Sequence, residues 1–348
     1  MPTDINSAAP VRFAAIGLDH RHIYGMSEGM IEAGCEFAGF WTEGQPQPYA
    51  GFVKRFPDIP RAEDRRSIME DTSISLVLIA SAPEHRAALA IEAMQHGKDV
   101  MIDKPGCIRL EELADIRKTV QATGRIWSVN FSERFEVRAV TRADELIKQG
   151  RIGQVVQTLG IGPHRLNAHM RPDWFFDPAQ YGGILGDIGA HQIDQFLHFT
   201  GADDAEIAHA AVGNFANPDR PLFQDFGEMN LATKTAQAYI RCDWYTPDAL
   251  PNWGDGRLFV LGTEGYIELR KYVDVCGRDG TDHLFVVNGT SCDYIDCRDA
   301  DLPYSRLLAH DVAHRTETAC SQYHTFKVTE LALTAQAQAV RRGHLSEA

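Results

Sequence analysis

The first 130 residues alternate short apolar runs with helix-like segments, and this alternation restricts the fold more than any other feature. The apolar runs are predicted strands at 11–16, 36–42, 76–80, 99–102 and 126–130. The segments 83–97 and 110–124 carry helical patterns that end at glycine. Strands joined by helices form a parallel sheet with helices on both faces. The sequence therefore predicts an α/β, doubly wound Rossmann domain over residues 1–130.

The pattern changes after about residue 150, where strand candidates follow one another without helices between them. They lie at 155–161, 206–212, 234–244, 258–261, 266–270 and 284–287, and an amphipathic helix over about 318–341 follows. Strands joined by turns form an open antiparallel or mixed sheet. Because 348 residues exceed what one core usually supports, we expect a second, α+β domain over 131–348. Its last helix can pack back on the first domain.

Composition excludes several classes of partner. The net charge of -14 is spread without long runs of one sign, which disfavours nucleic acid and anionic membranes. No apolar run is long enough to span a bilayer, and residues 1–10 lack the features of a secretory signal. The seven cysteines include no Cys-x-x-Cys pair, which is typical of reduced thiols. We expect a cytoplasmic protein that acts on a small molecule.

Gly17 ends the first predicted strand, where a dinucleotide-binding fold carries its glycine fingerprint. The pattern Gly-x-Gly-x-x-Gly needs glycine at 17, 19 and 22, but Asp19 and His22 hold the last two positions. Asp19 also places a negative charge where the backbone should approach a diphosphate. His20, Arg21 and His22 can offset this by donating to phosphate at the helix N-terminus, or Arg21 is simply a surface residue.

The end of the second predicted strand indicates which cofactor is used. A carboxylate there normally receives the adenosine ribose hydroxyls and selects NAD over NADP. Glu43 can reach the ribose, whereas Thr42 together with Lys54 or Arg55 would tolerate an extra phosphate. The sequence favours NAD without excluding NADP.

Further candidates follow the third and fourth predicted strands. Ser81, Pro83 and His85 come after the third, and Asp103 and Lys104 end the fourth, just before a proline. Ligands of parallel sheets bind beyond the carboxyl ends of the strands, so we expect these residues to contact the cofactor. A lysine held between a strand end and a proline is a fixed charge that can polarise a substrate oxygen or share its proton.

A glycine-rich turn at 182–186 leads into a predicted helix whose polar side chains are candidates for proton transfer. Apolar residues recur along it at helical spacing, and Asp187, His191, Asp194 and His198 fall on the opposite face. An imidazole beside a carboxylate is what proton transfer from an alcohol requires. The alternative is an ordinary solvated helix face, and the glycines at its entrance shift the balance toward function.

Polar and aromatic residues upstream of this helix are candidates for contact with a substrate. His164, Arg165 and Trp174 precede it in the chain, and Asn130 lies at the exit from the first domain as a hinge or pocket residue. Trp244 and Trp253 lie beside carboxylates and arginines, a combination that suits a polyhydroxylated ring. A role for these tryptophans in the core is the alternative.

Together these residues resemble the Gfo/Idh/MocA family of sugar and polyol oxidoreductases. The matching positions are the first-strand turn, Pro83 with His85, Gly97-Lys98, Asp103-Lys104-Pro105 in place of Glu-Lys-Pro, and Gly182-Gly183 through Asp187, Gly189, His191 and Asp194. The resemblance implies a Rossmann domain, a second domain with an open-faced, mainly antiparallel sheet often used for oligomerisation, and a nicotinamide cofactor. It also implies Lys104, Asp187 and His191 as the catalytic residues. Asp103 and the incomplete glycine fingerprint depart from the family pattern.

The expected function is therefore NAD(P)-dependent oxidation of a secondary hydroxyl of a sugar, sugar derivative or cyclitol. His191 would accept the hydroxyl proton, Lys104 would hold the oxygen and Asp187 would orient both, with no metal required. The expected partners are a small carbohydrate or polyol and further copies of the chain in a homodimer or homotetramer. Two alternatives stay open: a redox-neutral glycosidase or lyase that retains NAD, and a non-catalytic sugar-binding or regulatory protein.

Overall fold

The computed structural model describes residues 10–346, which form two compact units. The first unit runs to Asp103 and adds Ala114–Asn130 and Pro303–Thr325, and the second comprises Lys104–Leu113, Phe131–Leu302 and the chain from Phe326 on. Lys104 thus groups with the second unit, although the strand before it belongs to the first. The expectation of no secretory signal falls almost wholly on residues 1–9, outside the described part. No helix within 10–346 is long and apolar enough to cross a membrane.

The first unit is built on a five-stranded sheet in the order β2-β1-β3-β4-β5, with all neighbours parallel. Its strands are β1 (Arg12–Leu18), β2 (Glu36–Trp41), β3 (Leu76–Ala80), β4 (Asp99–Asp103) and β5 (Trp127–Asn130). Its helices are α1 (His22–Glu32), α2 (Tyr49–Arg55), α3 (Arg65–Glu70), α4 (Pro83–Gln95), α5 (Leu110–Thr123), whose first turn groups with the second unit, and α10 (Tyr304–His314). Each strand predicted for this half is present, so the Rossmann-type fold is confirmed.

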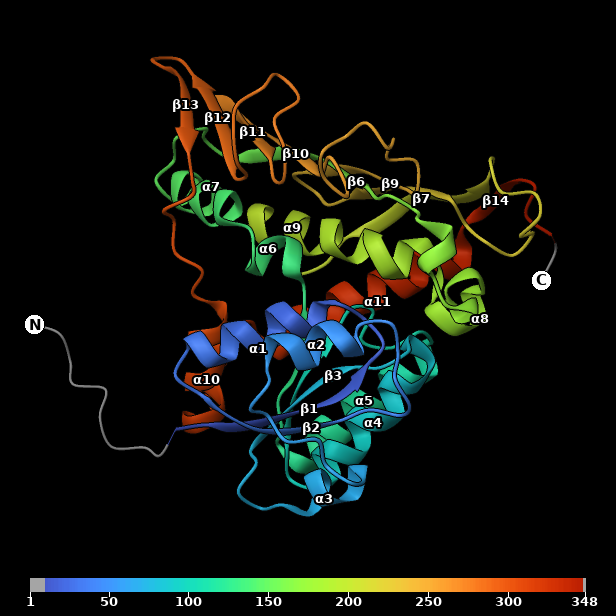
Figure 1. The fold of residues 1–348 in the computed structure, drawn as a ribbon. Helices are drawn as coiled ribbons and strands as arrows, with labels where there is room; N and C mark the ends of the chain where they lie inside the picture. The colour runs from blue at the N-terminus through green and yellow to red at the C-terminus, as the bar shows by residue number, and fades with distance from the viewer. Residues whose placement is uncertain (1–9, 347–348) are drawn as a thin grey trace, which may run out of the picture. The chain divides into compact units, whose positions relative to one another are not determined.

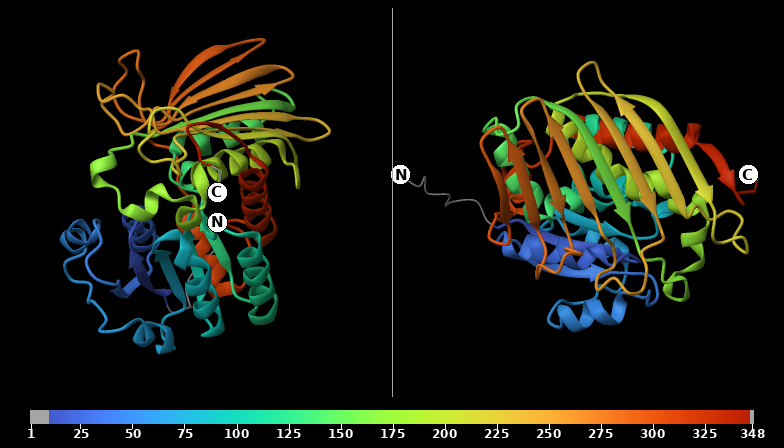
Figure 2. Two further views of the ribbon diagram at one scale, coloured as in Figure 1. Left: turned by 90° about the vertical axis from the view of Figure 1, so that its right-hand side faces the viewer. Right: turned by 90° about the horizontal axis from the view of Figure 1, so that it is seen from above.

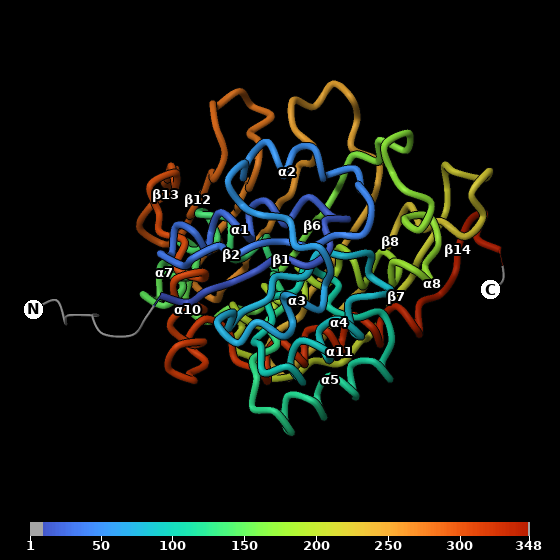
Figure 3. The backbone as a smooth tube through the Cα atoms, turned by 60° about the horizontal axis from the view of Figure 1, so that its bottom comes forward, coloured from blue at the N-terminus to red at the C-terminus, as the bar shows by residue number. Residues whose placement is uncertain are grey.

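Helices cover both faces of the parallel sheet. α1 lies on one face, and α4 and α5 lie on the other (Figure 1; Figure 3), as right-handed crossovers require. Every residue of β3 and β4 is buried, which explains why these strands are continuous apolar runs in the sequence. α10, which the sequence did not predict, packs on α1, where a Cβ added at Gly29 would lie 2.5 Å from Ser305 Oγ.

The second unit contains a nine-stranded sheet in the order β13-β12-β11-β10-β6-β9-β8-β7-β14. Its strands are β6 (Val155–Pro163), β7 (Glu206–Asn214), β8 (Phe226–Ala232), β9 (Gln237–Asp243), β10 (Arg257–Gly262), β11 (Gly265–Arg270), β12 (His283–Asn288), β13 (Cys292–Asp296) and β14 (Val340–Gly343). Only the pairs β6–β9 and β7–β14 are parallel, so the open, mainly antiparallel sheet is confirmed. Three strands were missed: β13 and β14 are exposed edges, and β8 lacks β-branched residues.

The helices of the second unit pack against one face of this sheet only. They are α6 (Ser132–Phe135), α7 (Arg138–Lys148), α8 (Pro178–Tyr181), the π-helical segment η3 (Leu185–Gly189), α9 (Ala190–Thr200) and α11 (Gln322–Gln338), whose first turn groups with the first unit, with short 3₁₀ turns η1 (Ala168–Met170) and η2 (Asp173–Phe176). α7 and α9 contact the strands directly, and Val140 and Ala143 of α7 share a core with Leu258, Val260 and Ile267 of the sheet. Within the described chain no helix covers the opposite face (Figure 2).

The helix that follows the glycine-rich turn is buried over most of its length. Residues 190–197 are all buried, so the alternative of an ordinary solvated helix face is wrong. One side of α9 packs against the sheet, and another side packs against α6. The polar side chains of α9 are paired inside the protein. Asp194 accepts two 2.6 Å bonds from Arg134, and His198 Nε2 lies 2.9 Å from Asp144.

The glycines before this helix have a packing role. Gly182 and Gly183 have φ of +89° and +79°, in the left-handed region that favours glycine. A Cβ on Gly182 would lie 2.7 Å from Ile108, and one on Gly183 would lie 2.2 Å from the Gln336 amide. Gln336 in turn accepts a hydrogen bond from the Leu185 amide. Close packing therefore explains this pair of glycines without a ligand.

Candidate active site

The end of β1 passes unusually close to the end of β3. Gly17 has φ of +76°, and a Cβ there would lie 2.6 Å from Ser81 Cβ, so only glycine fits. Beyond Leu18, the amides of Asp19 and His20 both donate to the Ala80 carbonyl, at 2.9 and 3.1 Å. These two N–H groups are directed at β3, so a diphosphate at this turn has to be held by other groups.

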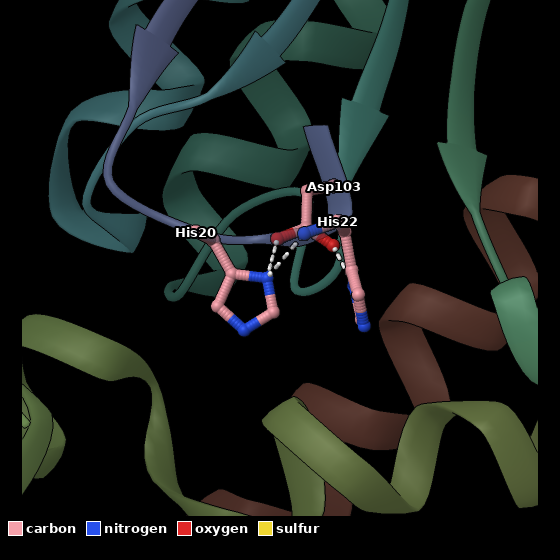
Figure 4. Close-up of side chains that lie close together, drawn as sticks. All are labelled: His20, His22 and Asp103. Atoms are coloured by element: carbon pink, nitrogen blue, oxygen red, sulfur yellow. Dashed lines mark hydrogen bonds and ion pairs between the residues drawn. The ribbon is translucent and has the colours of Figure 1, made fainter. Parts of the chain in front are cut away.

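Asp103, at the end of β4, is the centre of a buried polar cluster. Its carboxylate lies 2.9 Å from Arg86 Nη2, 2.9 Å from His20 Nδ1 and 2.7 Å from His22 Nδ1 (Figure 4). Burial opposes ionisation, but Arg86 and then the two histidines outweigh it and hold the pKa of Asp103 well below its usual range. Arg86 was not predicted, because nothing in a helical sequence marks which arginine reaches the sheet.

The residues expected at the adenosine ribose lie near the end of β2. Thr42 is buried, and its hydroxyl accepts from the Leu18 amide at 3.3 Å, whereas Glu43 is exposed. An unpredicted cation also lies here, because Arg61 donates to the carbonyls of Thr42 and Gly44 at 2.8 and 3.1 Å. This edge therefore offers one exposed carboxylate and one guanidinium.

The remaining residues expected to bind the cofactor surround the same strand ends. Pro83 begins α4 two residues after Ser81, and both are buried. His85 is exposed, with its ring nitrogen 3.8 Å from Glu84. The exposed Arg21 side chain donates to Gln47 at 3.1 Å. The structure thus places these residues at the carboxyl edge of the sheet.

Lys104 and Asp187 form an ion pair inside the second unit. Lys104 Nζ lies 2.7 Å from Asp187 Oδ1, and the two side chains are 4% and 14% exposed. Asp187 belongs to η3, which continues directly into α9, and His191 lies one turn further along at 2% exposure. The fold therefore joins two motifs that are 83 residues apart in the sequence.

A second buried ion pair, absent from the sequence predictions, lies near His191. Glu133 of α6 accepts from Lys271 Nζ at 2.5 Å and from Gln192 Nε2 at 2.7 Å, and all three residues are buried. Burial opposes ionisation of Glu133, but Lys271 and then His191 lower its pKa to about 2. Gln192 precedes Asp194 on α9, so this network ties the helix that carries His191 to the end of the sheet.

His164 lies close to both ion pairs. Burial and the nearby Lys104 ammonium lower its pKa to about 4, while Glu133 and Asp187 act in the opposite direction. Its ring lies 5.2 Å from that of Trp244 and 4.6 Å from that of Trp253. The second unit therefore gathers two lysines, two carboxylates and two imidazoles beside aromatic rings.

The other candidates for substrate contact are less closely grouped. Arg165 donates to the carbonyls of Pro247 and Leu250 at 2.8 and 2.6 Å, so its guanidinium holds a loop. Trp174 is half-buried, with its ring 6.2 Å from that of Phe175. Asn130 belongs to the first unit, where it is fully buried beside Asp103 at the end of β5.

The fold defines a Rossmann-type first domain followed by an α+β domain with a buried Lys–Asp pair. Comparison with known families agrees with this class. Residues 14–131 match the oxidoreductase family with an NAD-binding Rossmann fold, and residues 140–268 match the GFO/IDH/MocA C-terminal domain. The chain belongs to the Gfo/Idh/MocA family of oxidoreductases.

Curated relatives share roughly a quarter to a third of the aligned residues. The scyllo-inositol 2-dehydrogenase (NAD(+)) of Bacillus subtilis is 27% identical over 217 residues, covering 59% of this chain and 58% of that protein. The levoglucosan dehydrogenase of Pseudarthrobacter phenanthrenivorans is 30% identical over 195 residues, covering 55% and 49%. The chain thus matches only about half to three-fifths of the length of these relatives.

Solved structures share the fold over nearly the whole chain. A protein from Erwinia carotovora atroseptica described as an oxidoreductase is 43% identical, with a TM-score of 0.92 and coverage of 96% of this chain and 100% of that one. A levoglucosan dehydrogenase in complex with NADH is 20% identical, with a TM-score of 0.74 and coverage of 94% and 96%. The second likeness is one of fold alone.

Proposed function

We propose that the protein is an NAD(P)-dependent oxidoreductase that oxidises a secondary hydroxyl of a sugar, sugar derivative or cyclitol. The observation that carries this proposal is the 2.7 Å contact between Lys104 Nζ and Asp187 Oδ1, one helical turn before His191. Membership of an oxidoreductase family with an NAD-binding domain supports it. The names of the relatives, one an inositol and one a levoglucosan dehydrogenase, support the substrate class.

Each of the three residues has a distinct role in the proposal. His191 accepts the hydroxyl proton, because a neutral imidazole is a suitable base near neutral pH. Lys104 donates to the substrate oxygen and stabilises the charge that develops there. Asp187 holds the ammonium in place, since the pair is almost completely buried. A bound nicotinamide supplies the hydride acceptor.

The residues at the strand ends of the first unit fit a dinucleotide. Gly17 provides the close turn, and α1 begins beside it with the partial positive charge of a helix N-terminus. The residues that would hold the cofactor are Gly17, Asp19, His20, Arg21, His22, Thr42, Glu43, Ser81, Pro83, His85, Asp103 and Lys104. Because Asp19 and His20 direct their amides at Ala80, the side chains at 20–22 carry more of the diphosphate contact than in a glycine-rich turn.

The substrate would be held mainly by polar and aromatic groups of the second unit. Neutral His164 donates or accepts a hydrogen bond without adding charge, and the rings beside it offer apolar faces to a sugar ring. The other expected contacts are Asn130, Arg165, Trp174, Asp187 and His191. The buried Glu133–Lys271 pair would position His191 through Gln192.

We further propose that the chain assembles as a homodimer or homotetramer through the uncovered face of the nine-stranded sheet. Leu159 pairs across strands with Phe259, and these residues alternate with the buried Leu258 and Val260. Phe259 stacks on Tyr266 at 4.9 Å. An apolar row of this kind on an open sheet face is typical of an interface with a second copy.

The first test combines cofactor binding with turnover on a panel of sugars and polyols. Lys104→Ala and His191→Ala should each lower kcat by roughly 100-fold or more, because general acid–base groups contribute about that much. The dissociation constant for NAD should change little for His191→Ala. Stopped-flow or steady-state reduction of the cofactor measures the first quantity, and calorimetry measures the second.

His198→Ala is the matched control for the histidine variant. His198 lies on the same helix but is bonded to Asp144, so its loss should leave kcat within a few-fold of the wild type. Near-normal turnover by His191→Ala on an identified substrate would show that the assigned roles are wrong. Product without net accumulation of reduced cofactor would instead identify a redox-neutral reaction.

A further inference from the structure

Two histidines and one aspartate converge at the carboxyl edge of the parallel sheet. His20 Nδ1 lies 2.9 Å from Asp103 Oδ2, His22 Nδ1 lies 2.7 Å from Asp103 Oδ1, and the three ligand-type atoms lie within 4.8 Å of one another. The two rings stand on either side of the carboxylate (Figure 4). Within residues 10–346 no other three His, Cys, Asp or Glu side chains converge in this way.

The backbone holds these three residues in place before any ligand binds. The turn that carries His20 is tied to β3 through two hydrogen bonds to the Ala80 carbonyl. His22 is the first residue of α1, and Asp103 is the last residue of β4. A cluster mounted on anchored strand and helix ends loses little conformational entropy when a ligand binds.

Arg86 also holds the Asp103 carboxylate in place. Its Nη2 donates to Asp103 Oδ2 at 2.9 Å, while its Nε and Nη1 donate to the Ser81 and Asp103 carbonyls at 2.8 and 3.1 Å. Oδ2 thus lies between Arg86 and His20 Nδ1, whereas Oδ1 lies 2.7 Å from His22 Nδ1. Carboxylates that bind metals are commonly hydrogen-bonded in this way through their other oxygen.

We propose that His20, His22 and Asp103 bind a divalent transition-metal ion of the Zn²⁺ type, through both Nδ1 atoms and one carboxylate oxygen. Zn²⁺ bonds of about 2.0–2.1 Å in tetrahedral geometry separate the ligand atoms by about 3.3 Å. The 2.7 Å between His22 Nδ1 and Asp103 Oδ1 therefore needs to open by about 0.6 Å. His20 Nδ1 lies 2.9 Å from the other carboxylate oxygen, and the three ligand atoms lie within 4.8 Å of one another, so small side-chain rotations bring them to a common ion. Three protein ligands leave a fourth position for water or an anionic oxygen.

The proton balance of this site is simple. An ionised carboxylate only accepts hydrogen bonds, so in the metal-free state each Nδ1 carries the proton. The second nitrogen of each ring lies on the side away from Asp103 (Figure 4), and both rings are about a quarter to a third exposed. Each proton can move to that outer nitrogen when Nδ1 takes the metal, so the histidines bind as neutral ligands.

The chain contains a natural control for nonspecific metal binding. His310 and His314 on α10 are both exposed, and their rings stack at 4.3 Å, a spacing of i and i+4 that also attracts metal ions. Among residues 10–346 no third ligand-type side chain joins this pair, so we expect it to bind more weakly than the three-residue cluster. A double variant at each pair separates the two sites.

The test is titration of the purified full-length protein with Co²⁺ and Zn²⁺ in the absence of cofactor and substrate. We expect one equivalent to bind tightly, with the visible absorption of four-coordinate Co²⁺. His20→Gln/His22→Gln should weaken this binding by more than tenfold, whereas His310→Gln/His314→Gln should leave it unchanged. The single variant His22→Gln and thermal unfolding of every variant show whether a loss reflects misfolding.

Wild-type binding no tighter than that of His20→Gln/His22→Gln would overturn the proposal, and the cluster would then be a hydrogen-bonded support for Asp103 only. Loss of the tight site in His310→Gln/His314→Gln would overturn it as well. Because metal binding is measured without cofactor, its failure leaves the proposed oxidoreductase function untouched. Metal binding by a protein that reduces no cofactor would support the metal site and contradict the proposed oxidoreductase function.

Discussion

The protonation states of His164 and Glu133 in the second unit depend on the charges around them. Lys104 is paired with Asp187 and lies near His164, whose pKa is lowered to about 4 by burial and by that ammonium. Glu133 stays ionised because Lys271 outweighs the penalty of its burial. A substrate would therefore meet a neutral His164 at any pH above about 5.

The low pKa of His164 predicts a dependence of stability on pH. The unfolded side chain has a pKa of 6.5, so between pH 6.5 and about 4 the unfolded state binds a proton that the folded state does not. The contribution of this histidine to stability is complete above pH 6.5 and is lost as pH falls toward 4. Allowing for its partial exposure, we expect a loss on the order of 1–2 kcal/mol.

Urea unfolding of the wild type and of His164→Gln at several pH values measures this effect. The difference between their free energies of unfolding should shrink as pH falls from 6.5 to 4, because glutamine does not titrate. Other groups, including His198, titrate in both proteins and cancel in the difference. A difference that stays constant across this range would mean that His164 is not desolvated in solution.

At the scale of elements, the close approach of β1 to β3 depends on one glycine. A Cβ on Gly17 would lie 2.6–2.7 Å from the Cα and Cβ of Ser81, and neither backbone can move without shifting a buried strand. Gly97 has the same φ of +76° with no atom within 4 Å of its added Cβ. The two positions therefore differ in the room available for a Cβ but not in backbone conformation.

Gly17→Ala and Gly97→Ala should separate the cost of the clash from the cost of the positive φ. Both variants should lose about 1 kcal/mol in free energy of unfolding, because alanine is strained in the left-handed conformation. Gly17→Ala should lose roughly 1–3 kcal/mol more because of overpacking, and it should bind NAD more weakly. Chemical denaturation and calorimetry measure these quantities. Equal losses at the two sites would show that the strand ends move apart at little cost.

At the scale of the whole molecule, the uncovered sheet face predicts self-association. Leu159 on β6 and Leu222 in the loop before β8 are both 39% exposed, but only Leu159 belongs to the row with Phe259. Leu159→Arg should weaken the oligomer by more than tenfold, because a charge would be buried at the interface. Leu222→Arg should not. Sedimentation velocity over a concentration series distinguishes the two, and a monomeric wild type would contradict the proposal.

Much of the first unit could be predicted from local sequence because its strands are buried on both faces. Such strands are short apolar runs bounded by glycine and proline, and β3 was located to the residue. Edge strands β13 and β14 could not be found, since their side chains are exposed and their pairing depends on strands far away in the sequence. Whether the polar side of α9 is buried stayed open at the level of sequence, because periodicity does not reveal what covers the second side of a helix.

The sequence by itself determined the two-part organisation, the strand-end motifs and the residue types available for chemistry, because these follow from short-range periodicity and turn preferences. Only the tertiary structure decided which of them meet. Lys104 and Asp187 are 83 residues apart, and Glu133 and Lys271 are 138 apart. Asp103 could not be assigned to Arg86 and two histidines from spacing alone, since a buried charge takes whichever partners the packing of strands and helices brings within reach.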